Sequence, residues 1–213
     1  MTTATTIGDP VPHLEDRDSI GRRWRTGVVL LIVADVAFVG SMVFAYFYLR
    51  GLNTDGNWFP PDSSIAPIWV GWAIAGGVVV SAAVYRWGQA GILAGNRGRL
   101  VAGAGIASVL VVADIVAQVA QIASLPFGVN ASSYSSSVYV LAGANLFHLL
   151  LTLFLGIGLW NRARMGKYAA DNEWQVRLVG IWWTWIALAA IISAFATSFV
   201  ASPNHIVSVV VGS

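Results

Sequence analysis

The sequence has no cysteine among its 213 residues, and only 10% of its residues are charged. The first absence excludes disulfides, thiolate metal ligands and thiol catalysis. The second lies far below the roughly 25% of charged residues in a typical soluble domain. Also missing are the G-x-S-x-G, H-E-x-x-H and G-x-x-x-x-G-K motifs of common hydrolases and phosphate-binding proteins. Ordinary soluble enzymes and nucleic-acid-binding proteins are therefore excluded.

Hydrophobic residues make up 57% of the chain, and its mean hydropathy is +0.70. A soluble domain of this length has too little interior for so much apolar surface, so the composition predicts an integral membrane protein. Five apolar runs are each long enough to cross about 30 Å of hydrocarbon as a helix. We place these spans at residues 27–49, 65–85, 100–123, 138–160 and 178–201. The sequence therefore predicts an all-α bundle of five transmembrane helices.

The basic residues predict the orientation of this bundle. With a polar tail at residues 1–25, a membrane domain at 26–202 and a short tail at 203–213, eleven Lys and Arg residues fall on the side of the N-terminus. The opposite side has only Arg50. Since basic segments stay in the cytoplasm, we expect the N-terminus inside and the C-terminus outside. Arginines at the cytoplasmic ends of the spans are candidate contacts for anionic phospholipid headgroups, namely Arg25, Arg86, Arg99 and Arg162.

Polar side chains within the spans are informative because such groups are costly in hydrocarbon. They are Asp35 in span one; Asp114, Gln118 and Gln121 on one face of span three; and Asn145, His148 and Thr152 on one face of span four. Such faces should point into the bundle or toward a partner. Each group also has a structural interpretation, as a side chain that is hydrogen-bonded to a neighbouring helix.

His148 is the single histidine within a span, which provides neither a bis-histidine haem site nor a set of metal ligands. We therefore expect no haem, copper or other cofactor in this chain. Asp35 lies roughly 12 Å past Gly27 along span one. With span four taken to run in the same direction, His148 lies roughly 15 Å past Val138. The two groups should then lie at similar depth, where a hydrogen bond or ion pair is allowed if the helices are neighbours.

Tryptophans mark the expected membrane interfaces. An outer aromatic belt is expected to contain Trp58, Trp69 and Trp72. An inner belt is expected to contain Trp160 and Trp174. The run Trp182-Trp183-Thr184-Trp185 is interpreted as belt and packing residues near the cytoplasmic end of span five.

Three segments carry motifs in a fixed order. Residues 34–50 contain Ala-Asp-x-x-Phe and Ala-Tyr-Phe-x-x-Arg, and residues 58–61 are Trp-Phe-Pro-Pro. Residues 118–121 are Gln-Val-Ala-Gln, and residues 134–148 contain Tyr-x-x-x-Val-Tyr-x-x-x-Gly-x-Asn-x-x-His. This series resembles the S-E-x-x-F-F, A-Y-F-x-x-R, W-P-P, Q-x-x-E and Y-x-x-x-F-Y-x-x-x-G-x-H-x-x-H motifs of subunit III of haem-copper cytochrome c oxidases, in the five-helix bacterial form.

The resemblance covers spans one to four and is weak in span five. Asp35 stands where the family has its intramembrane glutamate, Asn145 where it has the first histidine of H-x-x-H, and Gln121 where Q-x-x-E has its glutamate. Residues 183–187 keep little of W-H-F-x-D-x-x-W, and Asp114 has no counterpart.

The resemblance implies a multi-pass subunit of a bacterial plasma membrane that is not catalytic alone. It would pack beside the catalytic subunit I, in a complex with subunit II, and haem and copper would lie in these partners. It would hold phospholipids and support sustained proton uptake while the complex uses electrons from cytochrome c or a similar donor to reduce oxygen to water. Asp35 would be the buried carboxyl, with His148 and Asn145 as polar partners.

Other interpretations remain open at this stage. A divergent member could belong to a related nitric oxide reductase. Asp35 and Asp114 could instead be relay carboxyls of a small proton-coupled transporter, although neither repeats nor broken helices are evident. The third interpretation is a purely structural membrane scaffold, in which the polar side chains are hydrogen-bonded to one another.

Overall fold

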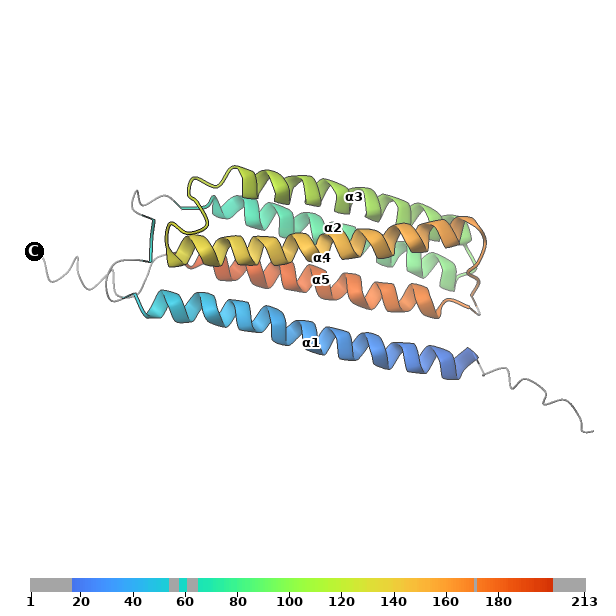
Figure 1. The fold of residues 1–213 in the computed structure, drawn as a ribbon. Coiled ribbons are helices and arrows are strands. Elements are labelled where there is room, and N and C mark those ends of the chain that lie inside the picture. Colours follow the sequence, from blue (N-terminus) through green and yellow to red (C-terminus); the bar gives the residue numbers. More distant parts are fainter. Residues whose placement is uncertain (1–16, 54–57, 61–64, 171, 201–213) are drawn as a thin grey trace, which may run out of the picture.

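The computed structural model describes residues 17–53, 58–60, 65–170 and 172–200. The helices are α1 (Arg17–Gly51), α2 (Ile68–Leu93), α3 (Arg97–Ala123), α4 (Ser133–Arg164) and α5 (Trp174–Ser198), as labelled in Figure 1. All five are long and apolar enough to cross a membrane, and the described residues contain no strand. These findings confirm the predicted all-α fold with five spans.

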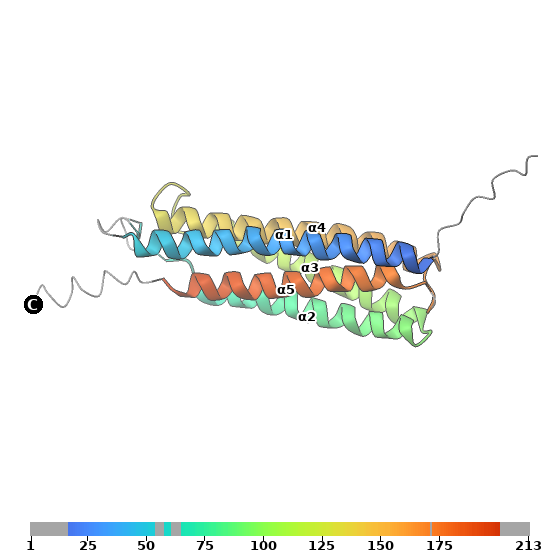
Figure 2. The ribbon, with the colours of Figure 1, turned by 90° about the horizontal axis from the view of Figure 1, so that it is seen from below.

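Helix α1 lies at the side of a more closely packed group of four helices (Figure 1). Within that group, α2 packs against α3 and α5, while α3 packs against α4. Among the described helices α1 contacts only α4 and α5, and Figure 2 shows it running alongside both. Only 6% of the apolar part of α1 is buried, compared with 56% of that part of α5. Helix α1 is therefore the peripheral helix of the bundle.

The helix directions correct one of the assumptions made from the sequence. Helices α1 and α4 run in opposite directions, because three turns of the chain separate them rather than two (Figure 1). His148 must therefore be measured from the other side of the membrane. It lies sixteen residues before Arg164, the last residue of α4, and remains near the middle of the helix. Asp35 and His148 therefore still lie at similar depth in the membrane, although the two helices run in opposite directions.

The helices also extend beyond the predicted spans. Helix α1 begins at Arg17, within the segment that was expected to be a polar tail, and α2 continues to Leu93. Helix α5 ends at Ser198, three residues before its predicted end. Hydropathy marks where a chain enters hydrocarbon, whereas a helix continues until its backbone hydrogen bonds end, so the two boundaries differ. Residues 1–16 of the predicted inner tail and all of residues 203–213 lie outside the described residues.

A tight turn joins α2 to α3. Gly95 adopts a positive φ of 75°, which a residue without a Cβ tolerates well, and the Asn96 side chain accepts a hydrogen bond from the Arg99 amide to cap α3. Further along these helices, Gly88 and Gly103 face each other so closely that a Cβ on Gly103 would lie 2.5 Å from the Gly88 Cα. Small residues permit this approach, as expected for helices in lipid.

Replacing Gly103 with leucine should force α2 and α3 apart. We expect a loss of roughly 1–3 kcal/mol in the free energy of unfolding, since overpacking strains the backbone of both helices. Unfolding by titration with sodium dodecyl sulfate in mixed micelles measures this. The matched control is Gly76→Leu, because nothing lies within 4 Å of a Cβ at that position. Equal midpoints for the two variants would contradict the prediction.

An aromatic cluster closes the end of the bundle where α1 ends and α4 begins. Trp58 is fully buried, with Tyr46 and Tyr134 at ring-centroid distances of 5.2 and 5.6 Å. The Trp58 indole donates to the carbonyl of Val200 at 2.8 Å. The interpretation of Trp58 as a belt residue is therefore wrong, because its ring packs in protein rather than at the lipid interface. Trp69, by contrast, is 73% exposed, as a belt residue should be.

Candidate functional site

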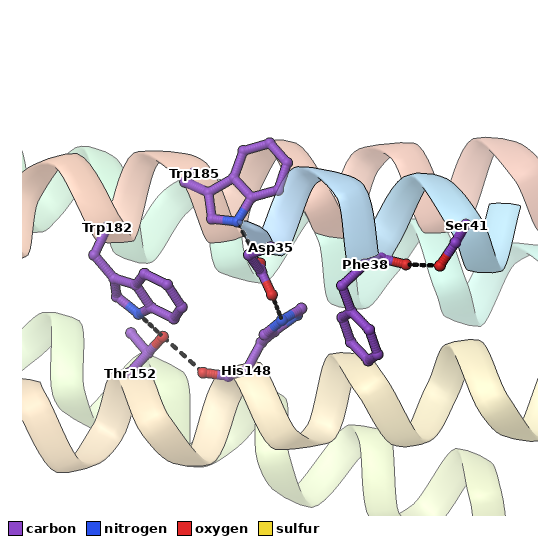
Figure 3. A network of polar contacts seen from close by, with 7 residues as sticks. All are labelled: Asp35, Phe38, Ser41, His148, Thr152, Trp182 and Trp185. Atoms are coloured by element: carbon purple, nitrogen blue, oxygen red, sulfur yellow. Dashed lines mark hydrogen bonds and ion pairs between the residues drawn. The ribbon is translucent and has the colours of Figure 1, made fainter. Parts of the chain in front are cut away.

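Asp35 lies at the junction of three helices, and its two carboxylate oxygens have different partners (Figure 3). The Oδ1 atom is 3.0 Å from Nε2 of His148 on α4. The indole N–H of Trp185 on α5 donates to Oδ2 at 2.5 Å. The side chains of Asp35 and His148 are only 13% and 3% exposed, so this contact is shielded from the surroundings. We call these three residues the Asp35 clasp, since they join α1 to both neighbouring helices.

The second part of this network fixes the position of His148. Thr152, one turn further along α4, donates its hydroxyl to the His148 carbonyl at 2.7 Å. The Trp182 indole donates to that hydroxyl oxygen at 3.1 Å (Figure 3). The Phe38 ring lies edge-on to the imidazole, with the ring centroids 6.3 Å apart. The Trp182 ring is also edge-on to the imidazole at 6.3 Å, so two aromatic rings contact the imidazole that meets Asp35.

A neutral amide chain lies on the same face of α4, one turn away from His148. Asn145 donates its amide N–H to Oε1 of Gln118 at 2.6 Å, and Gln118 donates to Oε1 of Gln121 at 2.7 Å. All three side chains line a cavity of about 50 Å³ between α2, α3, α4 and α5. A polar cavity of this size has room for ordered water. These amides join α3 to α4, which is the interhelical role that the sequence suggested as a structural interpretation.

Asp114 is separated from Asp35. It lies between α2 and α3, where its carboxylate occupies the space that a Cβ on Gly77 would need. Its Oδ2 atom is buried and has no hydrogen-bond partner among the described residues. Asp35 lies instead between α1, α4 and α5. The two carboxyls thus belong to different helix interfaces, although they share the same bundle.

The sequence motifs that suggested a family meet in space. The family model for cytochrome c oxidase subunit III matches residues 15–200, which is most of the chain. The chain belongs to the cytochrome c oxidase subunit III family. A comparison with curated proteins gave no match. As a member of this family, the chain is a multi-pass membrane subunit that associates with other oxidase subunits.

Two of the subunit III motifs converge on the clasp. Asp35 from the first motif and His148 from the last come within hydrogen-bonding distance across 113 residues of chain. Trp185 was missed as a member of this site, because the run from Trp182 to Trp185 was interpreted as belt and packing. All three tryptophans of the run are buried, and two of them donate hydrogen bonds to side chains of the network. The only available signal was that tryptophan buried in hydrocarbon needs an acceptor for its N–H.

Four arginines were predicted to contact lipid headgroups, and they have different surroundings in this subunit. Arg25 is exposed on α1. The guanidinium of Arg99 lies 4.8 Å from the centre of the Trp87 ring, and that of Arg162 lies 5.8 Å from the centre of the Tyr168 ring.

Burial raises the pKa of the Tyr168 phenol, which lies in the turn between α4 and α5, and the neighbouring Arg162 partly offsets this. The phenol therefore stays protonated and donates to Gln175 at 2.9 Å. Arg86, in contrast, lies within α2 instead of in the loop after it.

The residues that the structure describes contain no group of three or more His, Asp or Glu side chains close enough to hold a metal ion. The clasp has one imidazole and one carboxylate, whose nearest further partner is an indole N–H that cannot bind metal. The arrangement can hold a proton between a carboxylate and an imidazole, and it can anchor α1.

Proposed function

We propose that this chain is a non-catalytic, subunit III-like component of a haem-copper cytochrome c oxidase in a bacterial plasma membrane. It packs beside catalytic subunit I, in a complex that includes subunit II and carries haem and copper in those partners. It also holds phospholipids. The observation that supports this best is the family match over residues 15–200, together with the buried Asp35 clasp.

In this proposal, the clasp contributes to sustained proton uptake by the complex. A carboxylate and an imidazole at 3.0 Å can share a proton, and both are among the side chains that exchange protons most readily in membrane proteins. Trp185 orients the carboxylate by donating to its second oxygen. Asn145 and Gln118 extend polar contacts from α4 to α3 without adding charge.

Purification in a gentle detergent tests this function. We expect the chain to co-purify with a large haem-containing subunit and to show an oxidase absorption spectrum. The chain expressed alone should bind no haem and no copper, so it should have no Soret band. A colourless protein that transports protons with a solute would support the transporter interpretation instead, and a haem-containing complex that reduces nitric oxide would support the reductase.

The proposed orientation has the N-terminus in the cytoplasm, as the distribution of basic residues suggests. A reporter fused after Ser213 should therefore be active only on the outer face of the membrane. The same reporter fused before Met1 serves as the control and should be active only inside. Activity of the C-terminal fusion in the cytoplasm would contradict this orientation.

A further inference from the structure

Arg86 is a charged residue within the membrane-spanning part of α2. It lies seven residues before Leu93, which places its backbone about 10 Å from the end of the helix. Helix α2 has 26 residues and is about 39 Å long, so a hydrocarbon layer of about 30 Å centred on it begins about 5 Å from that end. The backbone of Arg86 is then several ångströms inside the hydrocarbon, on the exposed surface of the bundle.

The Arg86 side chain is held by Thr184 of α5 and by Gln89 of its own helix. Its Nε and Nη2 atoms donate to the Thr184 hydroxyl oxygen at 3.1 and 2.8 Å, and Nη1 donates to Gln89 at 3.2 Å. Thr184 lies ten residues after Trp174, the first residue of α5, or about 15 Å along that helix. Thr184 in turn donates to the Gly180 carbonyl, so its oxygen is oriented to accept from the guanidinium.

No carboxylate among the described side chains compensates the charge of Arg86. A guanidinium has five N–H donors, of which three are used here, and both acceptors are neutral. The three carboxylates whose side chains the structure describes are engaged or placed elsewhere. Asp35 belongs to the clasp, Glu173 pairs with Arg177, and Asp114 faces Gly77, nine residues from Arg86 along α2. A lone guanidinium in hydrocarbon is costly, which calls for an anion from outside the part of the chain that the structure describes.

The depth of the site favours a carboxylate of a protein over a phosphate of a lipid. Phosphates lie outside the hydrocarbon, whereas the guanidinium, which is bound to both Gln89 and Thr184, lies about 5–10 Å inside it by the same helix geometry. The surface of α5 beyond Thr184 continues as an exposed apolar stripe formed by Leu188, Ile191 and Phe195. Such a stripe, with a single cation at one end, fits a transmembrane helix that carries one acidic side chain.

We propose that the surface formed by Arg86, Thr184 and this stripe on α5 docks a transmembrane helix of a partner oxidase subunit, and that a carboxylate of that helix binds the two remaining N–H groups of Arg86. This inference rests on the proposed function, because it requires a partner subunit. It assigns Arg86 to a protein interface instead of to the lipid headgroups.

The test compares complexes purified through a tag on this chain, with the partner measured as haem-containing subunit per chain. Arg86→Gln should lower that ratio by at least about ten-fold, since it leaves the partner carboxylate unpaired in hydrocarbon. Arg177→Gln is the matched control, because this exposed arginine pairs with Glu173 in its own helix; it should retain the partner. Thermal unfolding of the isolated Arg86→Gln chain should show a transition lowered by no more than its lost bonds to Thr184 explain, and equal to that of Thr184→Val, which separates docking from folding.

Two further variants identify the type of anion. Arg86→Glu should abolish docking, and replacing the paired acidic residue of the partner with arginine should restore it. Retention of the partner by Arg86→Gln, with loss only of co-purified phosphatidylglycerol, would overturn the inference in favour of a lipid phosphate. Failure of the wild-type chain to co-purify with any haem-containing subunit would instead overturn the proposed function itself, and this inference with it.

Discussion

Replacement of Asp35 by asparagine should leave the oxidase complex assembled but shorten its active life during sustained turnover. Asparagine keeps the shape of the side chain, an oxygen that can accept from Trp185, and a polar group toward His148. It removes the group that can bind and release a proton. If the clasp contributes to proton uptake, the initial rate should be close to wild type, and the activity should then decline several-fold faster.

Measurement of oxygen consumption over many turnovers, together with the subunit content of the same sample, tests this prediction. Ser41→Ala is a suitable control on the same helix, because the Ser41 hydroxyl donates only within α1, to the Phe38 carbonyl (Figure 3). It should behave like wild type. Full, undiminished turnover in an assembled Asp35→Asn complex would exclude the proton role and leave the clasp as a structural contact.

Removal of one side of the clasp should strongly destabilise the attachment of α1. Asp35→Leu leaves His148 and Trp185 without their partner, and loss of one member of a buried pair costs roughly 3–5 kcal/mol. Trp185→Phe keeps an aromatic ring, although a smaller one, and loses the indole hydrogen bond to the carboxylate, so we expect a smaller loss of roughly 1–3 kcal/mol. Both losses should reduce the amount of assembled complex, because α1 contacts only α4 and α5 among the described helices.

Unfolding in mixed micelles measures these free energies. The double variant Asp35→Leu with His148→Leu should lose less free energy of unfolding than the sum of the two single losses, because each single change leaves the other group buried without its partner. Trp72→Phe is the control for Trp185→Phe: its indole also donates to a side chain, the Ser198 hydroxyl at 3.0 Å, but it lies at the exposed surface. Additive losses for Asp35 and His148 would show that the two residues act independently.

The sequence predicted the features of this fold that follow from its burial in the hydrocarbon of a membrane. Five apolar runs are visible in composition alone, because a chain must satisfy its backbone inside hydrocarbon as a helix. The periodicity of α4 also predicted correctly that Asn145, His148 and Thr152 share a face, and all three are buried. Whether that face meets α1 was not determined by periodicity, because a helix of one chain can pack against several neighbours.

The errors about Trp58, Trp185 and Arg86 share one physical cause, which is that local sequence does not report which helices are adjacent. Trp58 was interpreted as a belt residue because it flanks a span, yet Tyr46 and Tyr134 bury it. Trp185 was missed because its partner lies 150 residues away. Arg86 was placed in a loop because hydropathy falls there, whereas Thr184 and Gln89 hold it within α2. The match in depth between Asp35 and His148 held despite a wrong helix direction, since both lie near mid-membrane.

The wide separation of the clasp residues along the chain has a consequence for biogenesis. Asp35 is synthesised 113 residues before His148 and 150 residues before Trp185. At about 5–20 residues per second, the ribosome needs on the order of ten seconds to produce these partners. During that interval α1 already carries a carboxyl group at membrane depth with neither neighbour present. Helix α1 must therefore bear the cost of this unpartnered carboxyl alone, about 2.5–3.5 kcal/mol on the insertion scale, and its apolar residues, with a mean hydropathy of 2.5, offset that cost until α4 and α5 are made.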